Sequence, residues 1–212
     1  MSFFVVIPRI IYLLSYIPFR DSWGNGLVQR AIKNQETMFS YHSKLKATHY
    51  FASPFYEWPF IVRPIWYYSG KLSDTLREGI SSFGNPFVWW TGLPALVYVT
   101  YLFIRKKDKR ALFLIIGYLS QYLPWVLVTR LTFIYHYFPS VVFLVLMIGY
   151  SFRNLKETLS KKVYLTVLIT YGVLVFGLFC LFYPVLAGQP VEVDFAQKYL
   201  KWFKTWILVA GK

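Results

Sequence analysis

Residues 128–150 read VTRLTFIYHYFPSVVFLVLMIGY, and this stretch decides the fold class. From Thr132 onward it is mostly aliphatic and aromatic, which is typical of a helix that crosses a lipid bilayer. Arg130 and His136 nevertheless lie near its start. An ionisable group is costly next to hydrocarbon, so each of the two is a candidate functional residue until another role is found for it.

The composition of the whole chain also indicates a membrane protein. Of its 212 residues, 57% are hydrophobic, 22% are aromatic and only 15% are charged. A soluble domain of this length carries more charge and fewer unbroken apolar runs. We therefore predict an all-α integral membrane protein. Its single cysteine, Cys180, lies within an apolar run, and one cysteine cannot form an intrachain disulfide.

Basic residues cluster in two short gaps between apolar runs, Arg105–Arg110 and Arg153–Lys162. Short basic loops beside membrane helices mark the cytoplasmic side of the membrane. This placement accounts for the net charge of +14 better than binding to nucleic acid, which is not predicted.

Five apolar segments approach the roughly 20 residues that a membrane-spanning helix requires. They are residues 2–19, 87–104, 111–128, 132–152 and 163–188. With both basic gaps in the cytoplasm, the chain starts inside, and its C-terminus is extracytoplasmic. The predicted parts are a first transmembrane helix (1–19), an extracytoplasmic loop (20–86), a four-helix transmembrane region (87–188) and an extracytoplasmic tail (189–212). The predicted location is the cell membrane, as a multi-pass protein.

Two segments outside the predicted spans have the period of an amphipathic helix. In the long outer loop the periodic apolar residues are Val28, Ala31, Ile32, Met38, Phe39 and Leu45. In the tail the aromatic face consists of Phe195, Tyr199, Trp202, Phe203 and Trp206, with Asp194 placed as the N-cap. We expect both helices to lie in the membrane interface as anchors.

The segment THYFASPFYEWPFIVRPIWYY, residues 48–68, is the strongest candidate for a functional site. It places His49, Glu57 and Arg63 among tryptophans and tyrosines, including Trp66. Its three closely spaced prolines exclude a regular helix and predict an extended, stiff segment. An aromatic girdle at the membrane boundary is the alternative. A girdle, however, needs no carboxylate, guanidinium and imidazole on one rigid segment.

Further candidates lie at the predicted outer ends of the helices. Asn85 fits a helix-capping position, although its amide could equally meet a sugar hydroxyl or a phosphate. Arg130 is on the outer side, against the usual cytoplasmic bias of basic residues. Arg130, Arg63 and His136 could converge on a lipid phosphate, because guanidinium binds phosphate oxygens bidentately. For His136, a hydrogen bond between helices is an equally good interpretation.

These motifs resemble the C-terminal membrane region of the protein O-mannosyltransferases. The resemblance rests on QYLPW (121–125) followed by RLTFIYHYFPSVVFLVL (130–146), on the segment 48–68, and on GNPFVWW (84–90). It covers roughly residues 1–188, and Tyr50 departs from it, because the family usually has proline after histidine. It implies a GT-C glycosyltransferase of bacterial or archaeal type. Such enzymes move mannose from a polyprenyl- or dolichyl-phosphate carrier to serine or threonine hydroxyls of secreted or membrane proteins.

The family's catalytic Asp-Glu pair has no counterpart, because no two acidic residues are adjacent in this sequence. The reaction needs a carboxylate to take the proton of the acceptor hydroxyl, and Glu57 and Asp21 are only weak candidates. The resemblance therefore implies the C-terminal portion of an enzyme, inactive alone, whose N-terminal half could come from a partner chain. The alternative is a non-catalytic accessory or lipid-carrier-binding membrane protein.

No metal site and no cofactor is predicted, and the sequence contains no H-E-x-x-H or C-x-x-C motif. The residues expected to bind substrate are Arg63, Arg130, His49, Glu57, Asn85, Trp66, Tyr135 and His136.

Overall fold

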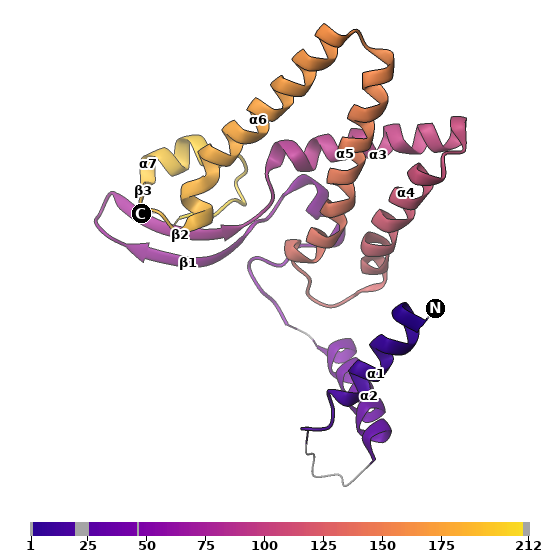
Figure 1. The fold of residues 1–212 in the computed structure, drawn as a ribbon. Helices are drawn as coiled ribbons and strands as arrows, with labels where there is room; N and C mark the ends of the chain where they lie inside the picture. Colours follow the sequence, from indigo (N-terminus) through magenta and orange to yellow (C-terminus); the bar gives the residue numbers. More distant parts are fainter. Residues whose placement is uncertain (1, 20–25, 46, 210–212) are drawn as a thin grey trace. The chain divides into compact units, whose positions relative to one another are not determined.

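The structure is a computed structural model that describes the chain except for residues 1, 20–25, 46 and 210–212 (Figure 1). Asp21, one of the weak catalytic candidates, lies outside the described residues. The chain divides into two compact units, residues 1–47 and residues 48–212.

The first unit contains a short apolar helix and an amphipathic helix. The apolar helix is a π-helical turn (Ser2–Val6) continued by α1 (Ile7–Leu14), and the amphipathic helix is α2 (Leu27–Lys44). Helix α2 confirms the helix predicted in the outer loop. The apolar stretch Phe3–Leu14 is shorter than the roughly 20 residues that a span requires. The structure therefore supports four of the five predicted spans.

Among the described residues, four helices are long and apolar enough to cross a membrane, and all belong to the second unit. They are α3 (Pro86–Lys106), α4 (Lys109–Tyr122) extended by the 3-10 turn η3 (Leu123–Leu127), α5 (Phe138–Thr158) preceded by the 3-10 turn η4 (Ile134–Tyr137), and α6 (Lys161–Ala187). Their bounds lie within a few residues of the predicted ones.

Local sequence signals set the ends of these helices. The side chains of Asn85, Asp108 and Ser160 accept hydrogen bonds from backbone N–H groups at the starts of α3, α4 and α6. Helix α3 ends at Lys107 and α6 at Gly188, both with a left-handed backbone (φ of 53° and 71°). The capping interpretation of Asn85 is therefore confirmed.

Helices α3, α4 and α5 pack closely, whereas α6 is mostly exposed. Glycines allow the close packing: a Cβ on Gly92 would lie 2.8 Å from Leu144 of α5, and one on Gly117 would lie 2.1 Å from Phe143. Within α6, which the structure describes throughout, the buried residues are Phe182 and Val185. They lie near the end of α6 that contacts β2, so α6 is held mainly at the sheet (Figure 1).

The described part of the second unit also contains a three-stranded antiparallel sheet, which the all-α prediction does not include. Its strands are β1 (Ile65–Lys71), β2 (Leu76–Ser82) and β3 (Val191–Glu192), in that order. The sheet joins the outer loop to the tail, because β3 follows α6 and pairs with β2. The transmembrane region is helical as predicted, and the difference lies in the outer loop and the tail.

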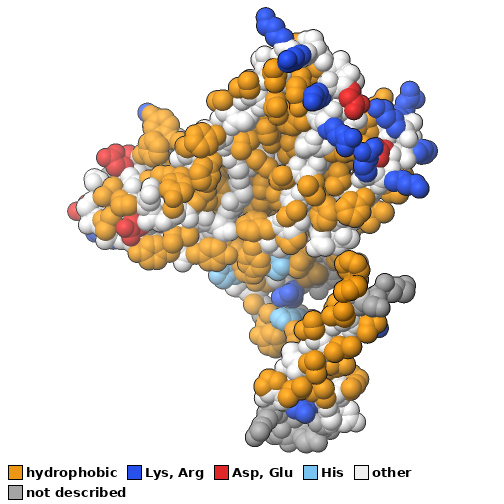
Figure 2. Space-filling model, in the orientation of Figure 1, with side chains coloured by type: hydrophobic (Ala, Val, Ile, Leu, Met, Phe, Trp, Pro, Cys, Tyr) orange, Lys and Arg blue, Asp and Glu red, His pale blue; other side chains and the backbone are white. Residues whose placement is uncertain are grey.

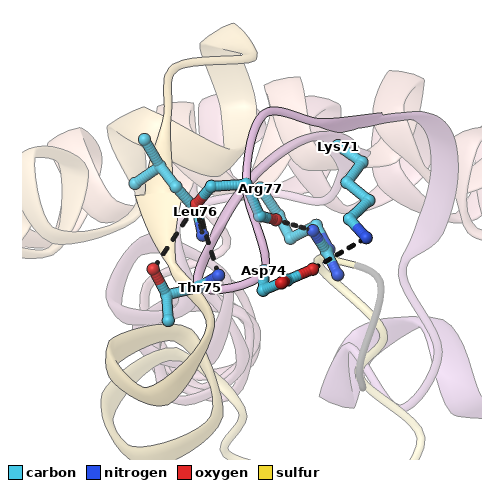
Figure 3. Close-up of polar contacts among 6 residues, drawn as sticks. Lys71, Asp74, Thr75, Leu76 and Arg77 are labelled. Carbon is cyan, nitrogen blue, oxygen red and sulfur yellow. Dashed lines mark hydrogen bonds and ion pairs between the residues drawn. The ribbon is translucent and has the colours of Figure 1, made fainter.

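Polar contacts hold the turn between β1 and β2 (Figure 3). Lys71 forms an exposed ion pair with Asp74 at 2.9 Å, and the Ser73 hydroxyl accepts a hydrogen bond from the Leu76 N–H at 3.0 Å. The buried face of β2 consists of Arg77, Gly79 and Ser81. Because this face is polar or small, it lacks the apolar alternation by which a strand is predicted.

The amphipathic helix predicted in the C-terminal tail is shorter than predicted, because the tail leaves the helical conformation after Leu200 and its end packs into the core. In the described part of the tail, residues 189–209, helical structure is limited to α7 (Val193–Phe195) and the π turn η5 (Ala196–Leu200), and Glu192 takes the N-cap position predicted for Asp194. Trp206 is fully buried, and its indole N–H donates to the Ile61 carbonyl at 2.7 Å. Burial of this large ring stabilises the irregular backbone of the tail. A continuous helix would not place the ring in this buried position.

Candidate functional site

Residues 48–68 form a 3-10 turn followed by strand β1 instead of the predicted extended segment. Pro54 precedes the turn η2 (Phe55–Phe60), and Ile61 after it has a left-handed backbone with φ of 53°. The prolines do exclude an α-helix, because Pro59 lacks the N–H that an α-helix would use. A single 3-10 turn accommodates Pro59, and the left-handed Ile61 ends it before β1 begins.

This segment is hydrogen-bonded to the stretch that precedes α5. The Ser53 N–H donates to the Thr132 carbonyl at 2.9 Å, and the Thr132 hydroxyl donates to the Ser53 carbonyl at 2.9 Å. The buried Trp58 indole N–H also donates to the Ser53 carbonyl, at 3.1 Å. Tyr122 at the end of α4 donates to the Phe55 carbonyl at 3.1 Å. Two candidate segments far apart in the sequence are thus joined into one structure.

His136 lies within the aromatic contact between these segments. Its ring is stacked on Trp58 with centroids 5.8 Å apart, and the centroids of Trp125 and Tyr135 are 4.2 and 4.4 Å away. Its Nδ1 lies 2.9 Å from the carbonyl oxygen of Phe133 and 3.1 Å from the Phe133 backbone nitrogen. His136 therefore holds its own 3-10 turn, and among the described residues its side chain hydrogen-bonds only to Phe133 and not to a neighbouring helix.

Arg63 is oriented by Tyr50 but keeps unused hydrogen-bond donors. Its Nη1 donates to the Tyr50 carbonyl at 2.6 Å, and its Cζ lies 5.6 Å from the centroid of the Tyr50 ring. Three buried polar atoms of this segment have no hydrogen-bond partner among the described residues: Nε of Arg63, Oε2 of Glu57 and Nε1 of Trp66. A buried polar atom without a partner is costly, so such a group of atoms in one segment indicates a site for a polar ligand.

Arg130 is the second half-buried guanidinium of this region. Among the described residues it forms no hydrogen bond or ion pair. Tyr135, which is 40% exposed, stacks on Phe133 with ring centroids 5.5 Å apart. His49 is exposed and lies edge-on to the same Phe133 ring at 5.3 Å, with its Nδ1 accepting a hydrogen bond from the Phe51 N–H.

The side chains of two other residues of the motifs are used in structural contacts. Asn85 caps α3 with its oxygen, and its Nδ2 donates to the Val175 carbonyl of α6 at 2.8 Å. The Tyr68 hydroxyl donates to the Glu78 carboxylate at 3.2 Å, and this anionic neighbour raises the pKa of Tyr68 above its usual range. The contacts of Asn85 do not connect it with Arg63 or Arg130.

Sequence reasoning missed the residues that assemble the site. Ser53 and Thr132 are small hydroxyl residues with no motif of their own, and Tyr118 and Tyr137, whose hydroxyls lie 2.9 Å apart, read as ordinary apolar positions. Only their long-range partners give them a role, and a single sequence does not contain that information.

The fold and the site define a multi-span membrane protein with an arginine-containing, aromatic-lined site at the ends of its helices. A model of the C-terminal four-span region of protein O-mannosyltransferases matches residues 27–206. The chain therefore belongs to the protein O-mannosyltransferase family.

Individual relatives agree with this assignment. Dolichyl-phosphate-mannose–protein mannosyltransferase 1 of Saccharomyces cerevisiae is 24% identical over 95% of this chain and 26% of its own length. Polyprenol-phosphate-mannose–protein mannosyltransferase of Mycobacterium tuberculosis is 23% identical over 88% of this chain and 42% of its own length. The chain thus spans less than half the length of these relatives.

A solved structure has the same fold. The structure of the S. cerevisiae protein O-mannosyltransferase Pmt1–Pmt2 complex bound to the sugar donor matches with a TM-score of 0.75 and 21% identity. The match covers 91% of this chain and 29% of the solved chain. At this identity the likeness concerns the fold alone.

Proposed function

We propose that this chain forms the carrier-binding portion of an enzyme that transfers mannose from polyprenyl or dolichyl phosphate to serine or threonine hydroxyls of proteins. Family membership and the four apolar helices support the proposal. The names of the bacterial and yeast relatives specify mannose on a phosphorylated isoprenoid lipid. In this proposal the C-terminus is extracytoplasmic and the site lies at the outer membrane boundary.

The observation that carries the proposal is that Arg63 and Arg130 have hydrogen-bond donors without a protein partner among the described residues. Arg63 has a buried Nε without a partner, and Arg130 forms no hydrogen bond or ion pair among the described residues. Both belong to segments that are hydrogen-bonded to each other through Ser53 and Thr132. Half-buried guanidinium groups lose hydration, so they favour an anion that accepts several N–H donors, such as a phosphate.

The arginines would act on the leaving group of the transfer. The bond between the sugar's anomeric carbon and a phosphate oxygen breaks, the acceptor oxygen bonds to that carbon, and negative charge remains on the lipid phosphate. Guanidinium groups held at the phosphate stabilise this charge more in the transition state than in the ground state, which lowers the barrier.

The neighbouring residues suit the sugar and the acceptor. Trp66 and Tyr135 offer an indole N–H and an exposed ring, and Glu57 offers a carboxylate oxygen without a protein partner. We assign these residues, with His49, to the sugar and acceptor pocket. His136 supports that pocket through its stacking on Trp58, and Asn85 has less support as a ligand because capping engages its oxygen.

We further propose that this chain does not transfer mannose alone. The acceptor hydroxyl must lose a proton to a carboxylate, and the adjacent acidic pair that the resemblance implies has no counterpart in this sequence. A partner chain that supplies the pair would complete the enzyme. The same absence favours the second candidate function, a non-catalytic subunit that binds the lipid carrier.

The test is binding of mannosyl-phosphoryl polyprenol by the detergent-solubilised protein and its Arg130 variants. Arg130→Ala should lose about 1.5–3 kcal/mol of binding free energy, the value typical of a charged hydrogen bond. Arg130→Lys should lose less, because it keeps the charge but not the bidentate geometry. Arg153→Ala, at an exposed arginine in the second basic gap, is the matched control and should bind like the parent.

Two results would contradict the proposal. If Arg130→Ala remains folded, as checked by thermal melting, and binds the carrier as well as the parent, Arg130 is only an interfacial anchor. If the unmodified chain alone mannosylates an acceptor peptide above the uncatalysed background, the inactive-portion proposal is wrong and Glu57 or Asp21 becomes the candidate base.

A further inference from the structure

A groove between three of the membrane helices has no role in the proposed transfer. It has a volume of about 260 Å³ and lies between α3, α5 and α6. Its walls include Ala95 and Tyr98 of α3, Ile148 and Phe152 of α5, and Val167 of α6. Pockets for whole drug-sized ligands are usually about 300–1,000 Å³, so this groove suits part of a flexible chain.

The groove offers an apolar surface although hydroxyl groups line it. Thr91 donates its hydroxyl to the Phe87 carbonyl of its own helix, and Ser151 donates to the Met147 carbonyl at 2.7 Å. These hydroxyls are therefore already used within α3 and α5, and the Thr91 hydroxyl also lies 3.4 Å from the Tyr171 hydroxyl of α6, which lines the groove as well. Since the three helices have the composition of membrane spans, the groove opens at a depth where hydrocarbon is the surrounding solvent.

Two cationic side chains lie beyond the groove, toward the basic ends of α3 and α5. Arg105 is seven residues beyond Tyr98, which places it two turns, or roughly 10 Å, farther along the same stripe of α3. Lys156 is one turn beyond Phe152 on α5. Both are exposed, and neither forms an ion pair among the described residues. Figure 2 shows lysine and arginine gathered at this end of the unit, away from the sheet.

The acidic residue of α5, Glu157, does not lie on the groove side of the helix and therefore does not neutralise these two cations. Glu157 is nine residues from Ile148, and at 100° per residue this places it on the opposite side of α5 from that groove residue. Tyr98 adds an amphipathic group between the apolar groove and Arg105, with a hydroxyl that has no hydrogen bond among the described residues. An apolar groove that continues into unpaired cations matches a molecule with a hydrocarbon chain and an anionic head.

We propose that the groove between α3, α5 and α6 binds an anionic phospholipid of the leaflet that faces the basic turns. One acyl chain lies along Ala95, Phe152 and Val167, and the headgroup phosphate contacts Arg105 and Lys156. Because α6 is weakly packed along most of its length, the lipid fills space between α6 and α5 and stabilises their arrangement. This site is separate from the carrier site, since its cations lie at the other ends of the same helices.

The experiment is native mass spectrometry of the detergent-solubilised protein with equal amounts of phosphatidylglycerol and phosphatidylcholine that carry the same acyl chains. The parent should retain phosphatidylglycerol in preference, by about fivefold for each contributing cation. Val167→Trp fills the groove and should abolish retention of both lipids. The matched control is Val173→Trp, at a 64% exposed position of α6 that does not line the groove.

The headgroup contact is tested separately. The double variant Arg105→Gln with Lys156→Gln should still retain lipid but lose the preference for phosphatidylglycerol, whereas Lys109→Gln should keep it. High salt should reduce the preference of the parent, because screening weakens exposed charge contacts. This salt measurement needs no variant, so the proposal stays testable if Val167→Trp fails to fold.

Three results would overturn the proposal. Equal lipid retention by folded Val167→Trp and by the parent would exclude the groove as the site. An unchanged lipid preference in the double variant or in high salt would exclude the headgroup contact. A change in oligomeric state with Val167→Trp, without any change in lipid retention, would show that a protein helix occupies the groove instead.

Discussion

The two ends of the four-helix region hold their cations in different ways. At the end that carries the sheet, Arg63 and Arg130 are half-buried, and Arg63 is oriented by the carbonyl and the ring of Tyr50. At the other end, Arg105 and Lys156 are exposed in or beside the two basic turns. Exposed cations keep their hydration, so the headgroup phosphate proposed for them is not a required partner. Half-buried guanidinium groups do need one, and this is why only the first pair marks a candidate catalytic region.

The comparison between the sheet end and the basic end of the helices depends first on the side of the membrane on which each end lies. With Cys180 replaced by serine, Gln189→Cys should react with a membrane-impermeant maleimide in intact cells, and Lys107→Cys should not. The effect is all-or-none, because the bilayer excludes the charged reagent from the cytoplasm. Permeabilised cells, in which both positions should react, are the control. Labelling of Lys107→Cys in intact cells would reverse the orientation and remove the proposed outer site.

The next largest effect should follow from removing the Trp58 ring, which joins the two segments of the proposed carrier site. Trp58 is 1% exposed and stacks on His136. Trp58→Ala should lower the free energy of unfolding by about 3–5 kcal/mol, the usual range for a buried aromatic residue, and should also abolish carrier binding. Trp202→Ala, at a 39% exposed ring, should cost much less. Equal losses in the two variants would mean that Trp58 has no special part in the site.

A smaller effect is expected from the hydrogen bonds between Ser53 and Thr132. Thr132→Val removes the hydroxyl donor and keeps the shape, so the free energy of unfolding should fall by about 0.5–1.5 kcal/mol. Carrier binding should weaken as well, because the segment of Arg63 would be less firmly held against that of Arg130. Thr166→Val is the control, since its hydroxyl bonds only within α6. If Thr132→Val binds the carrier as well as the parent, the hydroxyl of Thr132 does not contribute to carrier binding by joining the two segments.

The smallest effect concerns pH at the basic end. The Tyr150 hydroxyl, together with the Arg110 N–H, holds the pKa of Asp108 below its usual range. A carboxyl with a lowered folded-state pKa contributes stability above its unfolded pKa and loses it as pH falls through the folded value. The melting temperature should therefore be constant from pH 7 to pH 5 and should fall below about pH 4.

A variant comparison assigns this acid-induced change to Asp108. Asp108→Ala should melt at a lower temperature at pH 7 and should show a smaller further decrease in acid. Asp194→Asn, at an exposed position of the tail, should follow the parent. An identical acid response in Asp108→Ala and in the parent would show that other carboxyls govern the transition.

The membrane helices were predictable because their signals are local. Long apolar runs and Asn85 before Pro86 predicted the spans approximately, and the structure adds Asp108 and Ser160 as caps at two further helix starts. The first apolar run shows the limit of this reasoning. Its composition suits a membrane, but its helix breaks after Leu14 near Ser15 and Pro18, so hydrophobicity alone overestimated its length.

The candidate site was predictable only as a set of residues. Glu57, Arg63 and Trp66 stood out because charge and aromatic rings share a proline-rich segment, and the structure gives each a buried atom without a partner. The pairing of that segment with Thr132 was not predictable, since two hydroxyl residues 79 positions apart carry no mutual signal.

The sequence by itself therefore determined the membrane class, the approximate positions of the four long spans, the cap at Asn85 and the family, because hydrophobic runs, capping residues and ordered motifs are local properties of the chain. Only the tertiary structure decided that Trp206 is buried against Ile61, that Gly79 lies against the Leu208 carbonyl in a sheet, and that Ser53 meets Thr132. These contacts join distant residues, and their free energy depends on burial and hydrogen-bond geometry that exist only once the chain has folded.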